Sequence, residues 1–239
     1  MSSEHRRITV ADEAIEYSVR RSDDATEPRI DVGIHEIAVV LPNGVSADPE
    51  QMLVENGDWV ATKKRKFDRY REQIPDRQFE DGATFPYLGD PHEVVIEVRP
   101  AADVVDETLR LAEHNVERTS VKRALEALYR RKAREQFEDC ADRYAAEMDL
   151  DYDRIEIRNQ KTKWGSCSTT GTIGLNWRLL MAPPEIIEYV VIHELAHLRE
   201  PNHSEAFWSL VEQYDPDYTD HADWLDENST QLIFSDEDL

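Results

Sequence analysis

The residues best suited to chemistry lie in one stretch, His193-Glu194-Leu195-Ala196-His197, which is followed six positions later by His203. Histidines four positions apart project from one face of a helix, one turn above the other, so both imidazoles can reach a single metal ion. Glu194 would lie beside that ion, where a general base for a water molecule is needed. Three protein ligands with a free fourth position are typical of a catalytic zinc site. The spacing therefore predicts a zinc-dependent hydrolase.

The neighbours of this motif indicate that its helix is buried. The segment from Val190 to Leu198 is apolar on nearly every side except at the motif residues, which is typical of a helix inside a core. Burying two imidazoles and a carboxylate costs several kcal/mol unless they are paired or coordinate a metal. Pro183-Pro184 is expected to start this helix, because proline is tolerated in a first turn.

The third ligand has two candidate sources. His203 has the offset from His197 that metzincins use, although their motif carries a glycine where this chain has Glu200. A glutamate of the following helix, Glu205 or Glu212, could supply the ligand instead. The preference of zinc for nitrogen ligands and the proline break before His203 favour the histidine.

A peptide-cleaving site also needs a donor for the developing oxyanion, and the sequence does not choose among its candidates. They are Lys163, Arg178, Tyr189, Tyr218 and His221. Carboxylates that orient the imidazoles are also expected, and Glu205 and Glu212 are plausible candidates. Cys167 is expected to be a small buried side chain rather than a nucleophile, because no second cysteine lies near it.

The chain of 239 residues is strongly acidic, with a net charge of −23 from 51 acidic and 28 basic residues. The acid is spread along the whole length, which favours a solvated acidic surface suited to a high-salt, halophilic cytoplasm. No apolar run approaches 18 residues and the start has no signal-peptide pattern, so we expect a soluble, cytoplasmic protein without membrane contact. Its two cysteines do not form a disulfide framework.

Two basic clusters interrupt this acidity, Lys63–Lys66 and Arg130–Arg134. They could form a patch for nucleic acid, or they could balance nearby carboxylates on a solvated face. The second interpretation is favoured, because the net charge opposes general DNA affinity at moderate salt.

The pattern of elements predicts an α+β fold in two parts. Residues 1–100 are expected to form a β-rich N-terminal region with one helix, and residues 101–239 a second domain with a small sheet and the helix of the H-E-x-x-H motif. The boundary is expected near Pro100. The stretch from Ala101 to Met148 is expected to be helical, in two segments, and no internal repeat is visible.

Several motifs occur together with the H-E-x-x-H stretch: Lys163-Trp164-Gly165-Ser166-Cys167-Ser168, Gly174-Leu175-Asn176-Trp177-Arg178-Leu179, Pro183-Pro184, and Asn202-His203-Ser204-Glu205-Ala206-Phe207-Trp208. In order and spacing they resemble the YgjP-like metallopeptidases, a family of metal-dependent hydrolases related to SprT-like proteases. The resemblance covers roughly residues 150–210. It implies that residues 101–239 form a zincin-like metallopeptidase domain with an active-site helix. It also implies that His193, His197 and His203 bind zinc and that Glu194 is the catalytic base. No substrate comes with the resemblance.

A peptide or protein substrate is therefore the leading expectation, with Zn²⁺ as cofactor. The same chemistry would serve a zinc hydrolase of a non-peptide amide or ester. A protease module recruited to nucleic-acid complexes is a further alternative, supported only by the basic clusters. A zinc-stabilised structural protein would instead unfold on chelation without showing activity. The sequence does not indicate an oligomeric state.

Overall fold

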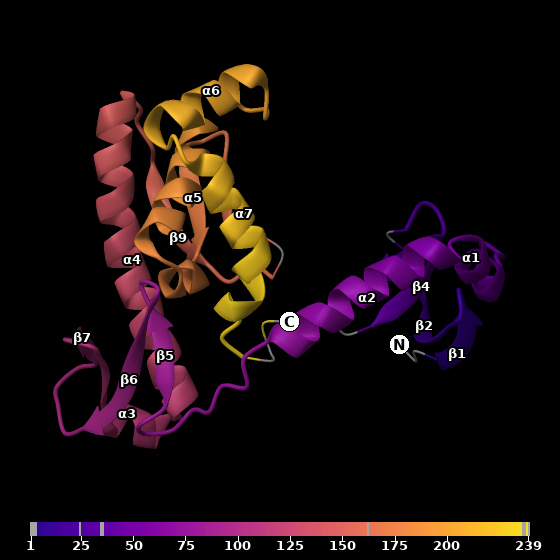
Figure 1. Cartoon of the computed structure of the whole chain (residues 1–239), viewed down its shortest axis with the longest axis horizontal. Coiled ribbons are helices and arrows are strands. Elements are labelled where there is room, and N and C mark those ends of the chain that lie inside the picture. Colours follow the sequence, from indigo (N-terminus) through magenta and orange to yellow (C-terminus); the bar gives the residue numbers. More distant parts are fainter. Residues whose placement is uncertain (1–3, 24, 34–35, 162, 236–237, 239) are drawn as a thin grey trace. The chain divides into compact units, whose positions relative to one another are not determined.

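The computed structural model describes residues 4–23, 25–33, 36–161, 163–235 and 238. The chain divides into two units, Met1–Ile74 and Pro75–Asp238 (Figure 1). Both units combine a β-sheet with helices, so the expected α+β fold class is confirmed. Among the described residues, no helix combines the length and apolar character needed to cross a membrane.

The first unit is built on a four-stranded sheet in the order β1-β2-β4-β3. β1 and β2 form an antiparallel hairpin, β2 and β4 run parallel, and β3 pairs antiparallel with β4. The hairpin turns at Ala11 and Asp12, which both have positive φ, as a tight two-residue connection requires. The strands are β1 (Glu4–Val10), β2 (Glu13–Ser22), β3 (Arg29–Val32) and β4 (Ile37–Pro42).

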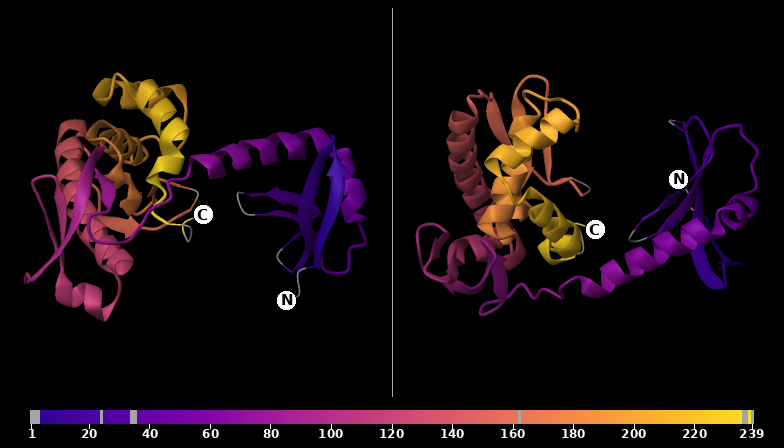
Figure 2. Two further views of the ribbon diagram at one scale, coloured as in Figure 1. Left: turned by 60° about the horizontal axis from the view of Figure 1, so that its bottom comes forward. Right: turned by 45° about the horizontal axis from the view of Figure 1, so that its top comes forward.

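Two helices, rather than the one expected, cover the sheet of this unit. They are α1 (Pro49–Glu55) and α2 (Gly57–Gln73), and α2 crosses one face of the sheet in every view (Figure 2). The helical stretch divides at Asn56, which caps the end of α1. A Cβ on Gly57 would lie 2.4 Å from Cγ1 of Val10, so a glycine is needed where α2 begins against β1.

The second unit begins with another four-stranded sheet, in the order β5-β6-β8-β7. Its strands are β5 (Thr84–Tyr87), β6 (Asp90–Glu97), β7 (Asp103–Val105) and β8 (Thr108–Ala112). The expectation of helix from Ala101 onward is therefore wrong for residues 103–112. In β8, Leu109 and Leu111 are fully buried and flank the less buried Arg110, which is the period of a strand.

Because of this sheet, the division between the two units does not lie near Pro100, where it was expected from the sequence. Strands β5 and β6 precede that proline and β7 and β8 follow it, yet all four pair in one sheet. Phe85 and Val94 from the first pair share a core with Leu109 from the second. A boundary at residue 100 would cut through this core, and the two units instead separate after Ile74.

The two units share a motif that the sequence does not reveal. In each sheet the first two strands form a hairpin, the second and fourth run parallel, and the third and fourth are antiparallel. In each unit two helices follow, α1 and α2 in the first, α3 (Glu113–Arg118) and α4 (Val121–Met148) in the second. The hairpin of the second unit turns at Leu88 and Gly89, again both with positive φ.

After α4 the chain forms the part of the second unit that carries the predicted motifs. A three-stranded sheet has the order β10-β11-β9, with β10 at one edge. Three α-helices and two short 3₁₀ helices follow it. The elements are β9 (Arg154–Arg158), β10 (Gly165–Cys167), β11 (Thr172–Asn176), η1 (Trp177–Met181), α5 (Pro184–Ala196), α6 (Glu205–Tyr214), α7 (Tyr218–Asn228) and η2 (Ser229–Leu232).

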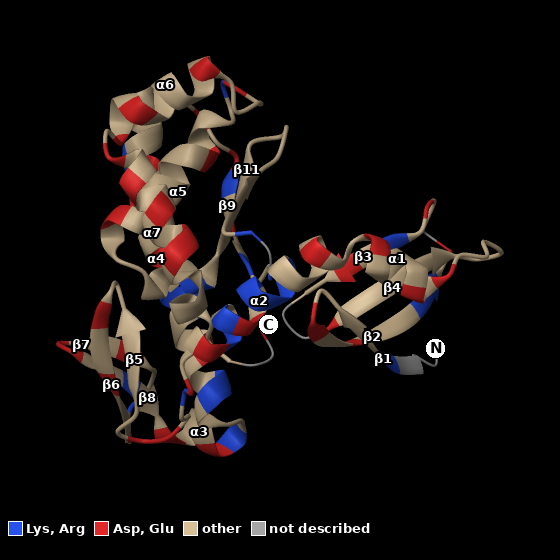
Figure 3. Ribbon diagram, turned by 45° about the vertical axis from the view of Figure 1, so that its right-hand side comes forward, with Lys and Arg blue, Asp and Glu red and all other residues tan. Residues whose placement is uncertain are grey.

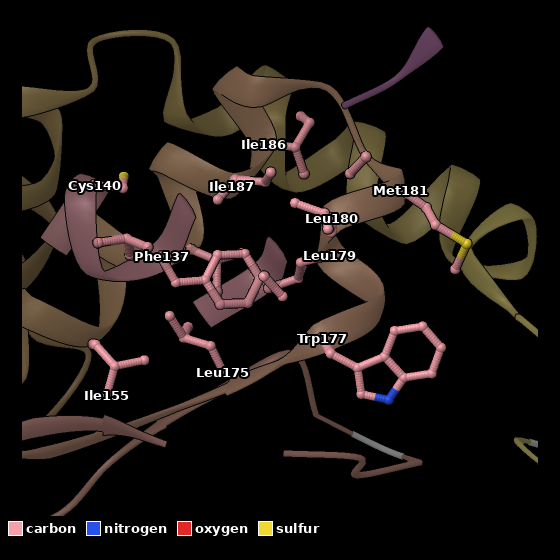
Figure 4. Close-up of a cluster of buried hydrophobic side chains, with 14 of the residues drawn as sticks. Phe137, Cys140, Ile155, Leu175, Trp177, Leu179, Leu180, Met181, Ile186 and Ile187 are labelled. Carbon is pink, nitrogen blue, oxygen red and sulfur yellow. The ribbon is translucent and has the colours of Figure 1, made fainter. Parts of the chain in front are cut away.

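One hydrophobic core joins these elements to α4. Phe137 of α4 lies beside Leu175 of β11 and Leu179 of η1, and Ile186 and Ile187 of α5 close the cluster (Figure 4). All five side chains are buried. The core therefore holds α5 against both the long helix and the small sheet.

Charged side chains are spread over both units, with acidic residues along α6 and α7 as well as elsewhere (Figure 3). Members of both basic clusters form ion pairs with carboxylates: Lys64 with Asp68, Arg65 with Glu13, Arg130 with Glu126, Lys132 with Asp103 and Arg134 with Glu138. This pairing favours charge balance over a nucleic-acid patch. The high-salt, cytoplasmic setting inferred from composition stays a prediction.

Candidate metal centre and active site

Helix α5 carries the H-E-x-x-H residues through the core of the second unit. Pro184 occupies its first turn, as expected, and the helix ends at Ala196 with His197 as its C-cap. Val190, Val191 and Ile192 before the motif are buried, and so are Leu195 and Ala196 within it. The buried helix predicted from the sequence is therefore present.

Three histidines converge beside this helix. His193, His197 and His203 each offer a nitrogen, and these nitrogens lie within 4.8 Å of one another. The Nε2 atoms of His193 and His203 are 3.1 Å apart. The three ring centroids are 4.8–5.0 Å from one another. The structure thus brings together all three residues that the spacing singled out.

This nitrogen cluster fits a metal ion. Two nitrogens bound tetrahedrally to one zinc at about 2.0–2.1 Å would lie about 3.3–3.4 Å apart, close to the His193–His203 separation. Burial, with the neighbouring imidazoles, lowers the pKa of His193 to about 4, so its ring is neutral and can donate a lone pair. Burial also lowers the pKa of His197. The buried Nδ1 of His193 has no hydrogen-bond partner among the described residues, so no protein group there fixes the tautomer of this ring.

Glu194 is a buried carboxylate next to these imidazoles. Only 7% of the residue is exposed, and burial raises its pKa to about 7, against the opposing effect of the charge of Lys163. A carboxyl group with such a pKa can accept a proton and release it again near neutral pH. The environment of Glu194 is therefore suited to acid–base chemistry.

Aromatic side chains of α6 pack against the three histidines. The fully buried ring of Phe207 lies 4.9, 4.5 and 4.8 Å from the rings of His193, His197 and His203. Trp208 contacts two of them, at 5.7 Å from His193 and 5.5 Å from His203. The sequence placed both aromatic residues in a motif without indicating this contact, because α6 must fold back over α5 to make it.

The loop between the helices explains the departure from the metzincin pattern. The N–H of Glu200 donates to the carbonyl of Ala196 at 2.9 Å, and φ of Glu200 is not positive. No glycine is needed for such a turn. The carbonyl of Glu200 also lies 3.2 Å from Nδ1 of His197, and Ser204 then caps α6 by accepting from Phe207 N.

Several other candidates do not reach the histidines. Arg178 is buried, and its guanidinium is already engaged by Asp238 at 3.0 Å and by the carbonyl of Gln160 at 2.6 Å, which disfavours it as an oxyanion donor. Glu205 and Glu212 are exposed, and neither forms a hydrogen bond with an imidazole among the described residues. The expected carboxylate partners of the histidines are therefore replaced by aromatic rings.

The remaining donor candidates stay close to the site. The ring of Tyr189 lies 5.9 Å from His193 and 6.4 Å from His221, whose Nδ1 is 2.9 Å from the Asp215 carboxylate. The positive charge of Lys163 acts to lower the pKa of Glu194. These contacts do not single out Tyr189, His221 or Lys163 as the oxyanion donor.

Cys167 is partly buried on the edge strand β10. Burial, with the nearby charge of Glu194, raises the pKa of its thiol to about 11. The thiol is therefore protonated at neutral pH, which argues against a nucleophilic role.

The comparisons with known proteins agree with the class of enzyme that this site suggests. Residues 26–228 match the family described as YgjP-like, metallopeptidase domain. The match covers most of the sequence. The chain belongs to this YgjP-like family, and it is accordingly a metal-dependent hydrolase of the metallopeptidase kind.

Two solved structures are similar to part of the chain. The metallopeptidase zymogen abylysin of Pyrococcus abyssi is 27% identical, with a TM-score of 0.34, over 38% of this chain and 93% of that one. The metallopeptidase zymogen jannalysin of Methanocaldococcus jannaschii is 22% identical, with a TM-score of 0.35, over 38% of this chain and 88% of that one. A search of curated proteins gave no match.

Proposed function

We propose that the chain is a zinc peptidase in which His193, His197 and His203 hold the ion and Glu194 acts as general base. The observation that carries the proposal is the convergence of three imidazoles beside a buried carboxylate whose pKa is raised to about 7. An all-nitrogen ligand set with no carboxylate favours zinc over calcium or magnesium. His203, rather than Glu205 or Glu212, is the third ligand in this proposal.

The protein supplies proton transfer and the ion supplies electrophilic chemistry. A bound zinc ion would polarise the substrate carbonyl and acidify a water molecule. Glu194 accepts the proton of the attacking water and passes it to the leaving amine. Its burial keeps the carboxyl pKa near the range where both transfers are favourable.

A peptide substrate is supported by the edge strand beside the site. Strand β10 pairs with β11 through Gly165, Ser166 and Cys167 and stands at the edge of the three-stranded sheet. An extended peptide can add to such an edge through backbone hydrogen bonds. Because β10 packs against α5, the added peptide would pass close to Glu194.

The test is a Glu194→Gln variant assayed at high salt against a broad peptide library. Glutamine keeps the shape of the side chain but cannot accept the proton, so hydrolysis should fall about 10²–10⁴-fold. Zinc content, measured by elemental analysis, should stay at one ion per chain. Glu205→Gln, at an exposed position of α6, is the matched control and should retain activity.

Full activity of Glu194→Gln would contradict the mechanism. Cleavage of small amide or ester substrates without cleavage of any peptide would favour a non-peptide hydrolase. Loss of activity together with loss of zinc would instead show that Glu194 acts on metal retention.

A further inference from the structure

The carboxylate of Glu194 lies directly against the backbone of strand β10. A Cβ built on Gly165 would be 2.3 Å from Oε1 of Glu194, 2.6 Å from its Cγ and 2.7 Å from its Cδ. Carbon atoms do not approach this closely without displacement. The side chain of Glu194 therefore occupies the space that any other residue at position 165 would fill.

Backbone conformation does not account for the glycine at this position. Gly165 lies in the extended strand β10, opposite Leu175 of β11, and its φ is outside the left-handed region. Any residue could adopt this backbone. The requirement for glycine is one of space, and the space is filled by Glu194.

Glu194 has little freedom to move away. It is 7% exposed, and its helix neighbours Leu195 and Ala196 are fully buried. The overlap with a Cβ at position 165 includes Cγ, so rotating the carboxylate about the end of the side chain does not relieve it. The close approach of its Cγ, Cδ and Oε1 to the backbone of β10 therefore restricts where the Glu194 carboxylate can lie.

We propose that Gly165 is a positioning residue for hydrolysis: its bare α-carbon provides the space for the Glu194 carboxylate, so that strand β10 sets the reach of the general base. This role rests on the proposed function of Glu194. It assigns a purpose to the glycine of the Trp-Gly-Ser-Cys motif, which the metal ligands leave unexplained. Strand β10 would then both border the path proposed for the peptide and fix the position of the Glu194 carboxylate.

Gly165→Ala is the direct test, with Gly33→Ala in the first unit as control, because a Cβ at Gly33 would meet only the carbonyl oxygen of Glu36 at an ordinary 3.6 Å. A displacement of about 1 Å can cost a catalytic group about 100-fold in rate. We expect kcat of Gly165→Ala to fall about 100-fold, with KM within about threefold of the original and zinc still bound at one ion per chain. Gly33→Ala should keep kcat within about threefold. Unchanged kcat in Gly165→Ala would overturn the proposal.

A double-mutant cycle with Glu194→Ala gives a second readout that does not depend on activity. Glu194→Ala removes the three atoms that a Cβ at position 165 would meet. If these contacts are the cause, Gly165→Ala should lower the Tm of the original chain and leave the Tm of Glu194→Ala almost unchanged. Equal losses of Tm in both backgrounds would overturn the proposal. The cycle measures this contact even if Glu194→Gln shows that Glu194 is not the base.

Discussion

The imidazole of His203 lies stacked on the indole of Trp208, with ring centroids 5.5 Å apart and planes inclined by 22°. The indole in turn stacks on Tyr218 of α7, at 5.3 Å and 18°. His203 is exposed and sits in the loop before α6, and its only hydrogen-bonding contact among the described residues is with His193. A stack of aromatic rings, rather than a carboxylate, therefore holds the orientation of the third proposed ligand.

Removing this stack should weaken metal binding. In Trp208→Ala the imidazole of His203 gains rotational freedom, and we expect zinc affinity to fall about 10–100-fold, the range found when groups that orient ligands are lost. Competition with a chromophoric chelator measures it. Trp59→Ala, which removes a tryptophan that is 46% exposed in the first unit, should leave the affinity unchanged. A Trp208→Ala protein with the original affinity would mean that the stack does not orient His203.

The identity of the third ligand can be tested directly. His203→Ala should reduce zinc affinity far more than Trp208→Ala, because it removes a nitrogen from the first coordination sphere. Glu205→Ala and Glu212→Ala should bind zinc as the original chain does, since both carboxylates are exposed and away from the imidazoles. Isothermal titration of the metal-free proteins compares all three. A larger loss in either glutamate variant than in His203→Ala would reassign the ligand.

Much of this site could be predicted because its signals are local. His193 and His197 lie one helical turn apart, and their helix could be recognised from its apolar neighbours and its proline start. The packing of Phe207 and Trp208 under the histidines could not, because it depends on the angle between α5 and α6. The contact of Gly165 with Glu194 joins residues that are far apart in the chain, and no periodicity encodes it.

A pH-dependent contribution to stability is expected from Glu188 on α5. Burial alone would raise its pKa, but hydrogen bonds from Tyr144 and Arg143 of α4, both 2.6 Å long, and the charges of Arg143 and His221 hold the pKa below its usual 4.5. Since the folded-state pKa is depressed, the stabilisation is fully present above pH 4.5. It is lost as the pH falls through the lower folded-state value.

Glu188→Gln should therefore be less stable than the original chain at pH 7, with the difference shrinking progressively below pH 4.5. Urea unfolding of both proteins with chelator present, from pH 7 to pH 3, measures the free energies without interference from bound metal. A difference in unfolding free energy that stays constant over this range would contradict the assignment. Protonation of Glu188 at low pH should remove the stabilisation that the glutamine variant lacks at every pH.

The buried ion pair of Arg178 and Asp238 should be important for stability. Their side chains are only 4% and 8% exposed, and Arg178 also donates to Asn176 Oδ1 at 3.3 Å. Breaking a buried pair leaves one charge uncompensated, so Arg178→Ala should lower the free energy of unfolding by about 3–5 kcal/mol. Arg154→Ala removes exposed pairs with Asp153 and Glu156 and should cost about 0–1 kcal/mol. Chemical denaturation compares the two, and equal small losses would contradict the structural role.

The errors in the fold predicted from the sequence have a common physical cause. Residues 103–112 contain two short strands, of which β7 pairs with β8 and β8 pairs with β6, and such short strands have weak local patterns. The single helix expected in residues 1–100 divides at Asn56, and the close approach of Gly57 to Val10 at this point is a contact made only in the folded chain. The domain boundary was misplaced for the same reason, since pairing across Pro100 is not visible in composition.

The two copies of the strand and helix motif both precede the segment that carries the proposed site. The second copy of the motif ends with α4 at Met148, and every proposed metal ligand, the general base and Gly165 come after it. Among the described residues neither copy contributes a histidine to the cluster, and the second copy supplies the core surface on which α5 rests. Protein engineers could therefore direct changes in catalysis to the segment after Met148, without altering the strands and helices of either copy.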